Sequence, residues 1–157
     1  MYKDSSQPIA ARVEDLLGRM TVEEKVAQLH GLMPLALYGQ EGLDPQKLEN
    51  MIGRGIGQIS MLHMMGGDDI TSVTQTANEI QKFLVQETRL DIPAIVHDEA
   101  LNGFVAAQAD NFPTPLGLAA TWSPELIEKM ADIVRQQMRA AGAQQALSPV
   151  LDIARDP

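Results

Sequence analysis

The sequence predicts an α/β fold built on a parallel sheet. Short, largely apolar segments at residues 56–62, 92–96 and 146–151 are typical of buried parallel strands. Between them, apolar residues recur at helical spacing in residues 73–84 and 126–138. This alternation implies right-handed crossovers and parallel pairing. It fits either an open doubly wound sheet or part of a (β/α)8 barrel, since a complete barrel needs about 200 residues or more.

The predicted helices begin at polar residues that can cap them. Residues 21–24, Thr-Val-Glu-Glu, have the form of a capping box, in which the Thr hydroxyl and the Glu carboxylate each accept a backbone N–H. The residues interpreted as caps are Thr21, Asp44, Asp68 with Asp69, and Ser123. We expect residues 1–55 to form a helical lead-in and residues 56–157 to form the first β/α units.

Composition narrows the function classes. The chain has 157 residues, with 12 Lys and Arg against 21 Asp and Glu, and a formal net charge of −9. An acidic chain repels phosphate backbones, so nucleic-acid binding is not expected. No apolar run approaches the ~18 residues that a membrane span needs, and the first residues show no secretory signal. With no Cys for disulfides or thiolate sites, we expect a soluble, cytoplasmic protein without a membrane partner.

The side chains that could carry chemistry follow the predicted strands, where parallel α/β folds bind ligands. His97, Asp98 and Glu99 come directly after the apolar run at residues 92–96. The plainer interpretation is that such carboxylates cap a helix or accept loop hydrogen bonds. A metal site formed by His63, His97 and Asp98 is a further alternative, but no HxH or HExxH spacing supports it. We therefore expect neither a metal nor another cofactor.

Five segments in a fixed order carry a more specific signal. They read RVEDLLGRMTVEEKVAQL, GIGQI, IPAIVHDEALNG, FPTPLGLAATW and SPVLDIARDP. They occupy residues 12–29, 55–59, 92–103, 112–122 and 148–157, so they are spread over nearly the whole chain. The third is similar to an "IPxxxxxEALHG" segment, the fourth to "FPxxxxLAATWD" and the fifth to the start of "PVLDxxRDPRWGR". Together they resemble glycoside hydrolase family 3 enzymes.

The resemblance implies both a fold and an activity. The fold would be the N-terminal portion of a (β/α)8 barrel, with about three β/α units after the lead-in. The rest of the barrel and an α/β sandwich domain would complete the protein. The activity would be that of a retaining, exo-acting β-glycosidase that releases terminal β-D-glucosyl or β-D-xylosyl residues from a small-molecule β-glycoside or an oligosaccharide.

The family's nucleophile and acid/base motifs do not occur in these 157 residues. We therefore expect no catalytic residue in this chain and no activity from the chain in isolation. The alternative is a non-catalytic barrel segment that functions only when it is assembled with another chain.

The resemblance assigns a substrate-binding role to Glu99, which opens the segment matching "EALHG". A carboxylate at this position accepts hydrogen bonds from the hydroxyl groups of the terminal sugar. Asp98 is a second substrate-binding candidate, as an orienting neighbour. Glu is longer than the Asp of many glucosidases, which favours pentosides such as xylosides. Asn102 stands where the family segment has His, so the role of that position stays open.

Overall fold

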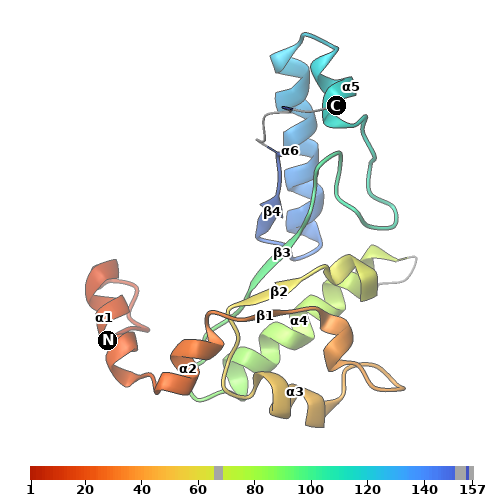
Figure 1. Cartoon of the computed structure of the whole chain (residues 1–157). Helices are drawn as coiled ribbons and strands as arrows, with labels where there is room; N and C mark the ends of the chain where they lie inside the picture. Colours follow the sequence, from red (N-terminus) through yellow and green to blue (C-terminus); the bar gives the residue numbers. More distant parts are fainter. Residues whose placement is uncertain (66–68, 151–154, 156–157) are drawn as a thin grey trace.

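A computed structural model describes residues 1–65, 69–150 and 155 (Figure 1). The elements, in chain order, are α1 (Ile9–Arg19), α2 (Val22–Ala27), β1 (Gly31–Leu32), the 3-10 helix η1 (Pro34–Leu37), α3 (Pro45–Ile52), β2 (Gln58–Ser60), the 3-10 helix η2 (Leu62–Met65), α4 (Ile70–Gln86), β3 (Ile95–Glu99), α5 (Pro115–Ala119), α6 (Pro124–Ala140) and β4 (Gln145–Leu147).

The four strands form one sheet in the order β1-β2-β3-β4, and every pairing is parallel. The predicted α/β fold class is therefore confirmed. Strand β1 is an addition, because Gly31–Leu32 lies within the range expected to be a helical lead-in. Two residues carry no readable periodicity, and this strand is recognisable only through its pairing with β2.

The hydrophobic core lies between one face of the sheet and the helices α4 and α6. Figure 1 shows α4 beside β1 and β2, and α6 beside β4. Ile59 of β2 and Val96 of β3 are paired in register and are both buried. The helices contribute the buried residues Val73, Ala77, Ile80, Leu84, Val134 and Met138. Burial of a Leu or Ile side chain stabilises by about 1.5–3 kcal/mol, so packing against the sheet holds these helices in place.

The predicted caps are confirmed wherever the structure describes them. Thr21 and Glu24 form the reciprocal capping box, with Glu24 Oε2 2.8 Å from the backbone nitrogen of Thr21. Asp44 accepts from two amides at the start of α3, Asp69 caps α4 and Ser123 caps α6. Asp68 lies outside the described residues. These caps satisfy helix N–H groups that would otherwise have no partner.

Strands β3 and β4 are displaced from their predicted positions. Strand β3 covers Ile95–Glu99, whereas the apolar run predicted residues 92–96. Strand β4 covers Gln145–Leu147 and ends before the cis peptide bond between Ser148 and Pro149. A strand is held by backbone hydrogen bonds, so the ladder of β3 continues through the polar residues His97, Asp98 and Glu99.

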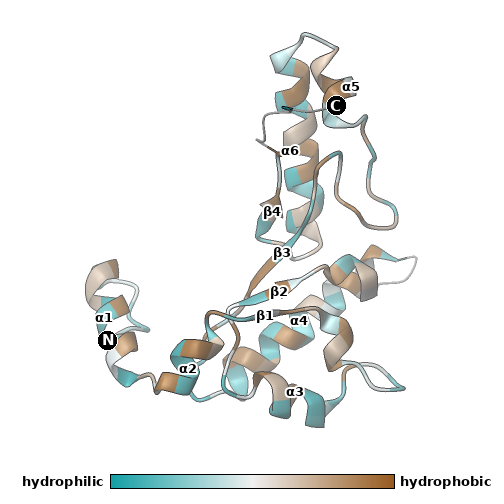
Figure 2. Cartoon of the chain, in the orientation of Figure 1, coloured by the Kyte–Doolittle hydropathy of each residue, from teal (hydrophilic) through white to brown (hydrophobic). Residues whose placement is uncertain are grey.

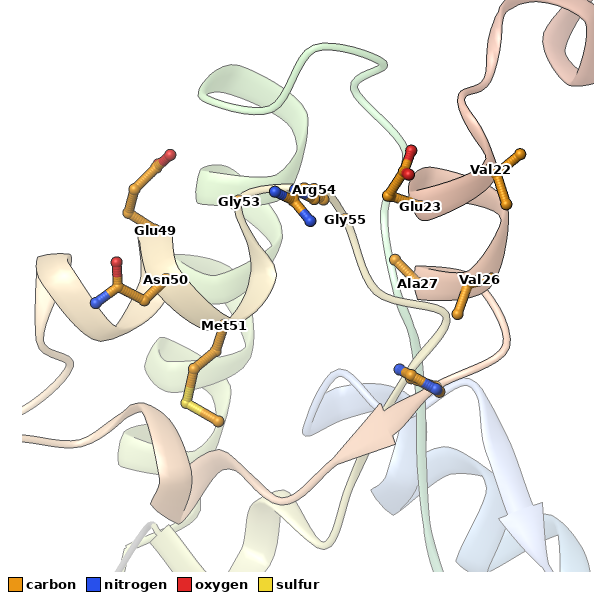
Figure 3. A pocket seen from close by; sticks show the side chains of 11 residues that line it. Val22, Glu23, Val26, Ala27, Glu49, Asn50, Met51, Gly53, Arg54 and Gly55 are labelled. Atoms are coloured by element: carbon orange, nitrogen blue, oxygen red, sulfur yellow. The ribbon is translucent and has the colours of Figure 1, made fainter.

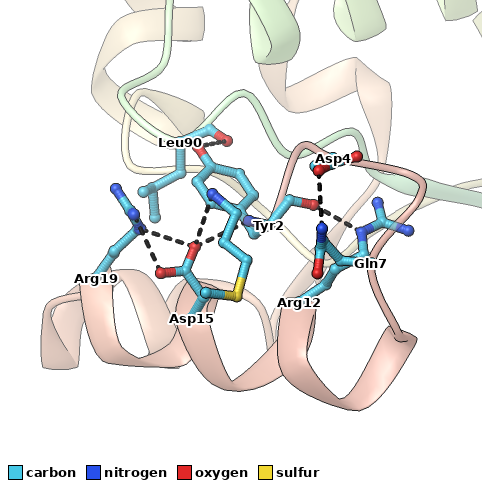
Figure 4. A network of polar contacts seen from close by, with 8 residues as sticks. Tyr2, Asp4, Gln7, Arg12, Asp15, Arg19 and Leu90 are labelled. Carbon is cyan, nitrogen blue, oxygen red and sulfur yellow. Dashed lines mark hydrogen bonds and ion pairs between the residues drawn. The ribbon is translucent and has the colours of Figure 1, made fainter.

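The amino-terminal residues are attached to the rest of the molecule by a polar network (Figure 4). The backbone nitrogen of Tyr2 lies 2.9 Å from Asp15 Oδ2, and its phenol donates to the carbonyl oxygen of Leu90 at 3.2 Å. Arg12 Nε donates to the carbonyl oxygen of Tyr2 at 2.8 Å, and both Nε and Nη2 of Arg19 reach Asp15 at 3.1 Å. Hydrogen bonds from Arg19 and from Tyr2 lower the pKa of Asp15 to about 2.

Large apolar side chains remain exposed at both ends of the chain. Figure 2 shows hydrophobic ribbon segments on α1, α2 and α5, away from the core. Helix α1 has no buried residue, and Leu29, Leu116 and Trp122 are more than four-fifths exposed.

Among the described residues, none of the helices has the length and apolar character needed to cross a membrane.

Candidate functional site

Asp98 and Glu99 are the last two residues of β3, at the carboxyl end of the sheet. The sequence predicts both residues in the loop that follows the strand, and that prediction is wrong. Both residues pair within the ladder, Asp98 opposite Ala146 and Glu99 opposite Leu147 of β4. Their positions are therefore held by backbone hydrogen bonds to a neighbouring strand, which is a more rigid support than a loop.

Successive side chains of β3 point to opposite faces of the sheet. Val96 and Asp98 lie on the face covered by α4 and α6, and both are buried. Ile95, His97 and Glu99 lie on the other face, where Ile95 is 47% exposed. Glu99 thus stands on the open face at the edge where parallel α/β folds bind ligands.

Asp98 is fully buried and is satisfied by protein donors. Its Oδ1 lies 2.6 Å from Nδ1 of His63 and 2.8 Å from the backbone nitrogen of Glu99, and its Oδ2 lies 3.4 Å from the backbone nitrogen of His63. The exposed fractions of the side chains are 0% for Asp98 and 12% for His63. Buried carboxylates need such partners. The Asp98 side chain is therefore held by protein partners, and its role as an orienting neighbour in substrate binding stays a prediction.

The backbone between β2 and η2 carries His63 to this position. Met61 follows β2 with φ 56°, a conformation that residues other than glycine rarely adopt. Its backbone nitrogen donates to the carbonyl oxygen of His97 at 3.2 Å. This sharp turn places η2 over the end of β3. From the sequence His63 is only a candidate metal ligand, and no local pattern indicates its pairing with Asp98.

Glu99 is half-buried, and among the described residues its carboxylate makes no hydrogen bond or ion pair. Its carbonyl oxygen accepts from the backbone nitrogen of Val105 at 3.5 Å. Its carboxylate is therefore available to a ligand on the open face of the sheet, while the backbone that carries it is held.

The long loop after β3 is closed by Asn102. Its Nδ2 donates to the carbonyl oxygen of Phe112 at 3.2 Å, and the backbone nitrogen of Phe112 donates to the carbonyl oxygen of Asn102 at 2.8 Å. The next residue, Gly103, has φ 121°, and a Cβ there would lie 2.3 Å from the carbonyl oxygen of Asp110. Asn102 thus has a structural role, and Gly103 cannot be replaced without moving the loop.

His97 shares the open face with Glu99 and pairs in register with Ser60 and Gln145. Its Nδ1 is buried and has no hydrogen-bond partner. Among the residues that the structure describes, no three or more His, Cys, Asp or Glu side chains are grouped so that they could hold a metal ion. The considered set of His63, His97 and Asp98 therefore does not assemble into such a group.

A pocket of about 660 Å³ lies at the opposite end of the sheet (Figure 3). Helices α2 and α3 form its walls, and the segment before β2 contributes Gly53, Arg54 and Gly55. Its charged lining residues are Glu23, Glu49 and Arg54. Because it lies at the amino ends of the strands, it is separate from the site at Glu99.

The comparisons with known proteins agree with this geometry. Residues 21–157 match the glycosyl hydrolase family 3 N-terminal domain. Over 168 residues the chain is 36% identical to β-glucosidase C of Emericella nidulans, covering 100% of this chain and 26% of that protein. It is 34% identical to a periplasmic β-glucosidase/β-xylosidase of Dickeya chrysanthemi, covering 99% of this chain and 25% of that protein.

A solved structure gives the same result in three dimensions. The β-glucosidase of Erythrobacter marinus superposes with a TM-score of 0.85 at 27% sequence identity, covering 99% of this chain and 20% of that one. The chain spans about a quarter of the length of the curated relatives named above. The chain belongs to glycosyl hydrolase family 3 and corresponds to the N-terminal part of its barrel domain.

Proposed function

We propose that the complete protein containing this chain is a retaining, exo-acting β-glycosidase acting on terminal β-D-glucosyl or β-D-xylosyl residues. This chain supplies sugar binding through Glu99. A retaining mechanism uses two carboxyl groups about 5–5.5 Å apart, one as nucleophile and one as acid/base. In this proposal both belong to the remainder of the barrel and the following domain.

The observation that carries the proposal is the position of Glu99. The residue that opens the family segment stands at the carboxyl end of a strand, on the face not covered by helices, with a carboxylate that no described residue engages. A charged acceptor forms stronger hydrogen bonds with hydroxyl groups than a neutral one. Such bonds orient the sugar ring for attack at its anomeric carbon.

The first test is hydrolysis of nitrophenyl β-glucoside and β-xyloside by the complete polypeptide. Glu99→Gln is expected to lower kcat/KM about 10- to 100-fold, the range for loss of a hydrogen bond to a charged group. Glu79→Gln, which changes an exposed carboxylate of α4, is the matched control and should have no effect. Equal rates for the Glu99 variant and the unmodified protein would refute the proposed role.

Retention of anomeric configuration has a separate measurement. Proton NMR of the first sugar released should show the β-anomer before mutarotation begins. Early formation of the α-anomer would contradict a retaining mechanism while leaving the glycosidase assignment intact.

The length of Glu99 bears on sugar choice. We propose that its carboxylate crowds a 6-hydroxymethyl group, so that β-xylosides are preferred over β-glucosides. Glu99→Asp would withdraw the carboxylate by one methylene and should raise the ratio of kcat/KM for glucoside to that for xyloside. An unchanged or lower ratio would show that another residue sets the preference.

The second candidate is a barrel segment that acts only with a separate chain. In the described part of the chain β1 and β4 each pair on one side only, and either the same polypeptide or a separate chain could supply the missing neighbours. Denaturing mass measurement of the purified active species separates the two cases. One long polypeptide supports the first candidate, whereas two chains support the second.

A further inference from the structure

We infer that His63 is a positioning residue for the sugar site, acting through Asp98 on the carboxylate of Glu99. The inference rests on the proposed function, because it assigns His63 a part in the same glycoside site. Three observations carry it: the shared oxygen of Asp98, the burial of the pair, and a Glu99 carboxylate that has no hydrogen-bond partner among the described residues.

The first observation is that one oxygen atom serves both residues. Asp98 Oδ1 lies 2.6 Å from His63 Nδ1 and 2.8 Å from the backbone nitrogen of Glu99. The ring of His63 therefore fixes the rotamer of Asp98, and Asp98 in turn fixes the peptide group from which Glu99 projects. Short hydrogen bonds with a carboxylate acceptor are the strong class, so this link is well suited to set geometry.

The second observation is that the pair is sealed from water. The Asp98 side chain is 0% exposed and that of His63 is 12% exposed, so water cannot replace the imidazole as the partner of the carboxylate without a rearrangement. The two residues are 35 positions apart and come from different elements, η2 and β3. The contact thus joins the loop after one strand to the end of the next.

The third observation concerns Glu99 itself. Within the described residues no donor reaches its carboxylate, so its placement depends on its backbone and on the strand end. A displacement of about 1 Å in a group that orients a substrate can lower the rate 100-fold. Loss of the His63 contact would free the Asp98 side chain and weaken its hydrogen bond to the Glu99 peptide, which supplements the ladder pairing with β4.

The experiment is a double-mutant cycle in the complete polypeptide, with nitrophenyl β-glucoside and β-xyloside as substrates. His63→Leu removes the donor at Nδ1 and should lower kcat/KM about ten-fold or more, mainly through KM. In a Glu99→Gln background the same change should cost less than about two-fold, because the carboxylate being positioned is already gone. His63→Asn retains a donor near Nδ1 and should restore most of the activity.

His30→Leu is the matched control, since His30 is exposed and lies at the opposite end of the sheet. It should leave kcat/KM unchanged. An equal loss from His63→Leu in both backgrounds, or no loss in the native background, would overturn the inference.

A folding defect is separated from positioning by a second variant. Where His63→Leu alone does not fold, the double change His63→Leu with Asp98→Asn removes the unpaired buried charge. We expect Tm to recover while kcat/KM stays low. Recovery of Tm and kcat/KM together would show a purely structural role. If the unmodified protein hydrolyses glycosides but the effect of His63→Leu does not depend on Glu99, this inference alone is refuted. If the unmodified protein does not hydrolyse glycosides, both the proposed function and this inference are refuted.

Discussion

The carboxyl end of β3 and the amino-terminal segment each use an aspartate to join distant residues, in opposite surroundings. Asp98 is fully buried against His63, whereas Asp15 joins Tyr2 and Arg19 at the surface, with 18% of its side chain exposed beside an Arg19 that is 51% exposed. Water and salt can replace the partners of Asp15 but not those of Asp98. The two aspartates therefore contribute differently to stability, because their surroundings differ.

The largest expected effect is on the buried side of this comparison. His63→Leu leaves the Asp98 carboxylate without its ring partner in a site closed to water. Breaking a buried pair by removing one member typically costs about 3–5 kcal/mol. Denaturant unfolding should show this loss in the free energy of unfolding, while Arg19→Leu, which breaks the exposed pair, should cost less than about 1 kcal/mol. Equal losses of unfolding free energy from His63→Leu and Arg19→Leu would show that burial does not distinguish the two pairs.

An intermediate effect on stability is expected from changing Glu24, which is itself nearly buried but pairs with an exposed arginine. Its side chain is 9% exposed, it completes the capping box of α2, and it binds Arg89, whose side chain is 56% exposed. The Arg89 hydrogen bond is the main cause of the lowered pKa of Glu24. Glu24→Ala should reduce stability by about 1 kcal/mol, the usual cost of losing a cap.

Differential scanning calorimetry gives the Tm of this variant. The control is Glu23→Ala, which alters a neighbour outside the capping box. A Tm as low as that of His63→Leu would contradict the order proposed here.

The same contrast explains which features could be predicted from the sequence. The caps at Thr21, Asp44 and Ser123 could be predicted, because a cap is a contact between residues two or three positions apart. The parallel sheet could be predicted as well, because the apolar runs of its strands and the helical spacing between them are local patterns. The apolar run before Glu99 placed it near the carboxyl end of the sheet, and the family resemblance added its expected role.

The features that could not be predicted depend on contacts between distant residues. The end of β3 was missed because Asp98 and Glu99 look like loop residues until His63, 35 positions earlier, is seen to satisfy Asp98. Strand β1 has two residues and is defined by its partner β2. Helix α5 is short, contains Gly117 and has no buried residue, so no apolar periodicity marked it.

The smallest expected effect is the pH dependence of the exposed pair. Hydrogen bonds from Arg19 and Tyr2 hold the pKa of Asp15 at about 2, below its ordinary value of 3.8. Because the folded form binds the proton less readily than the unfolded form, the stabilisation from Asp15 is complete above about pH 4 and is lost as the pH falls towards 2. The native protein and Asp15→Asn should therefore differ slightly in Tm at pH 6 and converge at pH 2, and added salt at pH 6 should narrow the gap. A gap that persisted at pH 2, or that salt did not change, would mean that Asp15 acts through its shape or its neutral hydrogen bonds rather than through its charge. In that case the contacts of Asp15, like those of the buried Asp98, would not be weakened by water and salt.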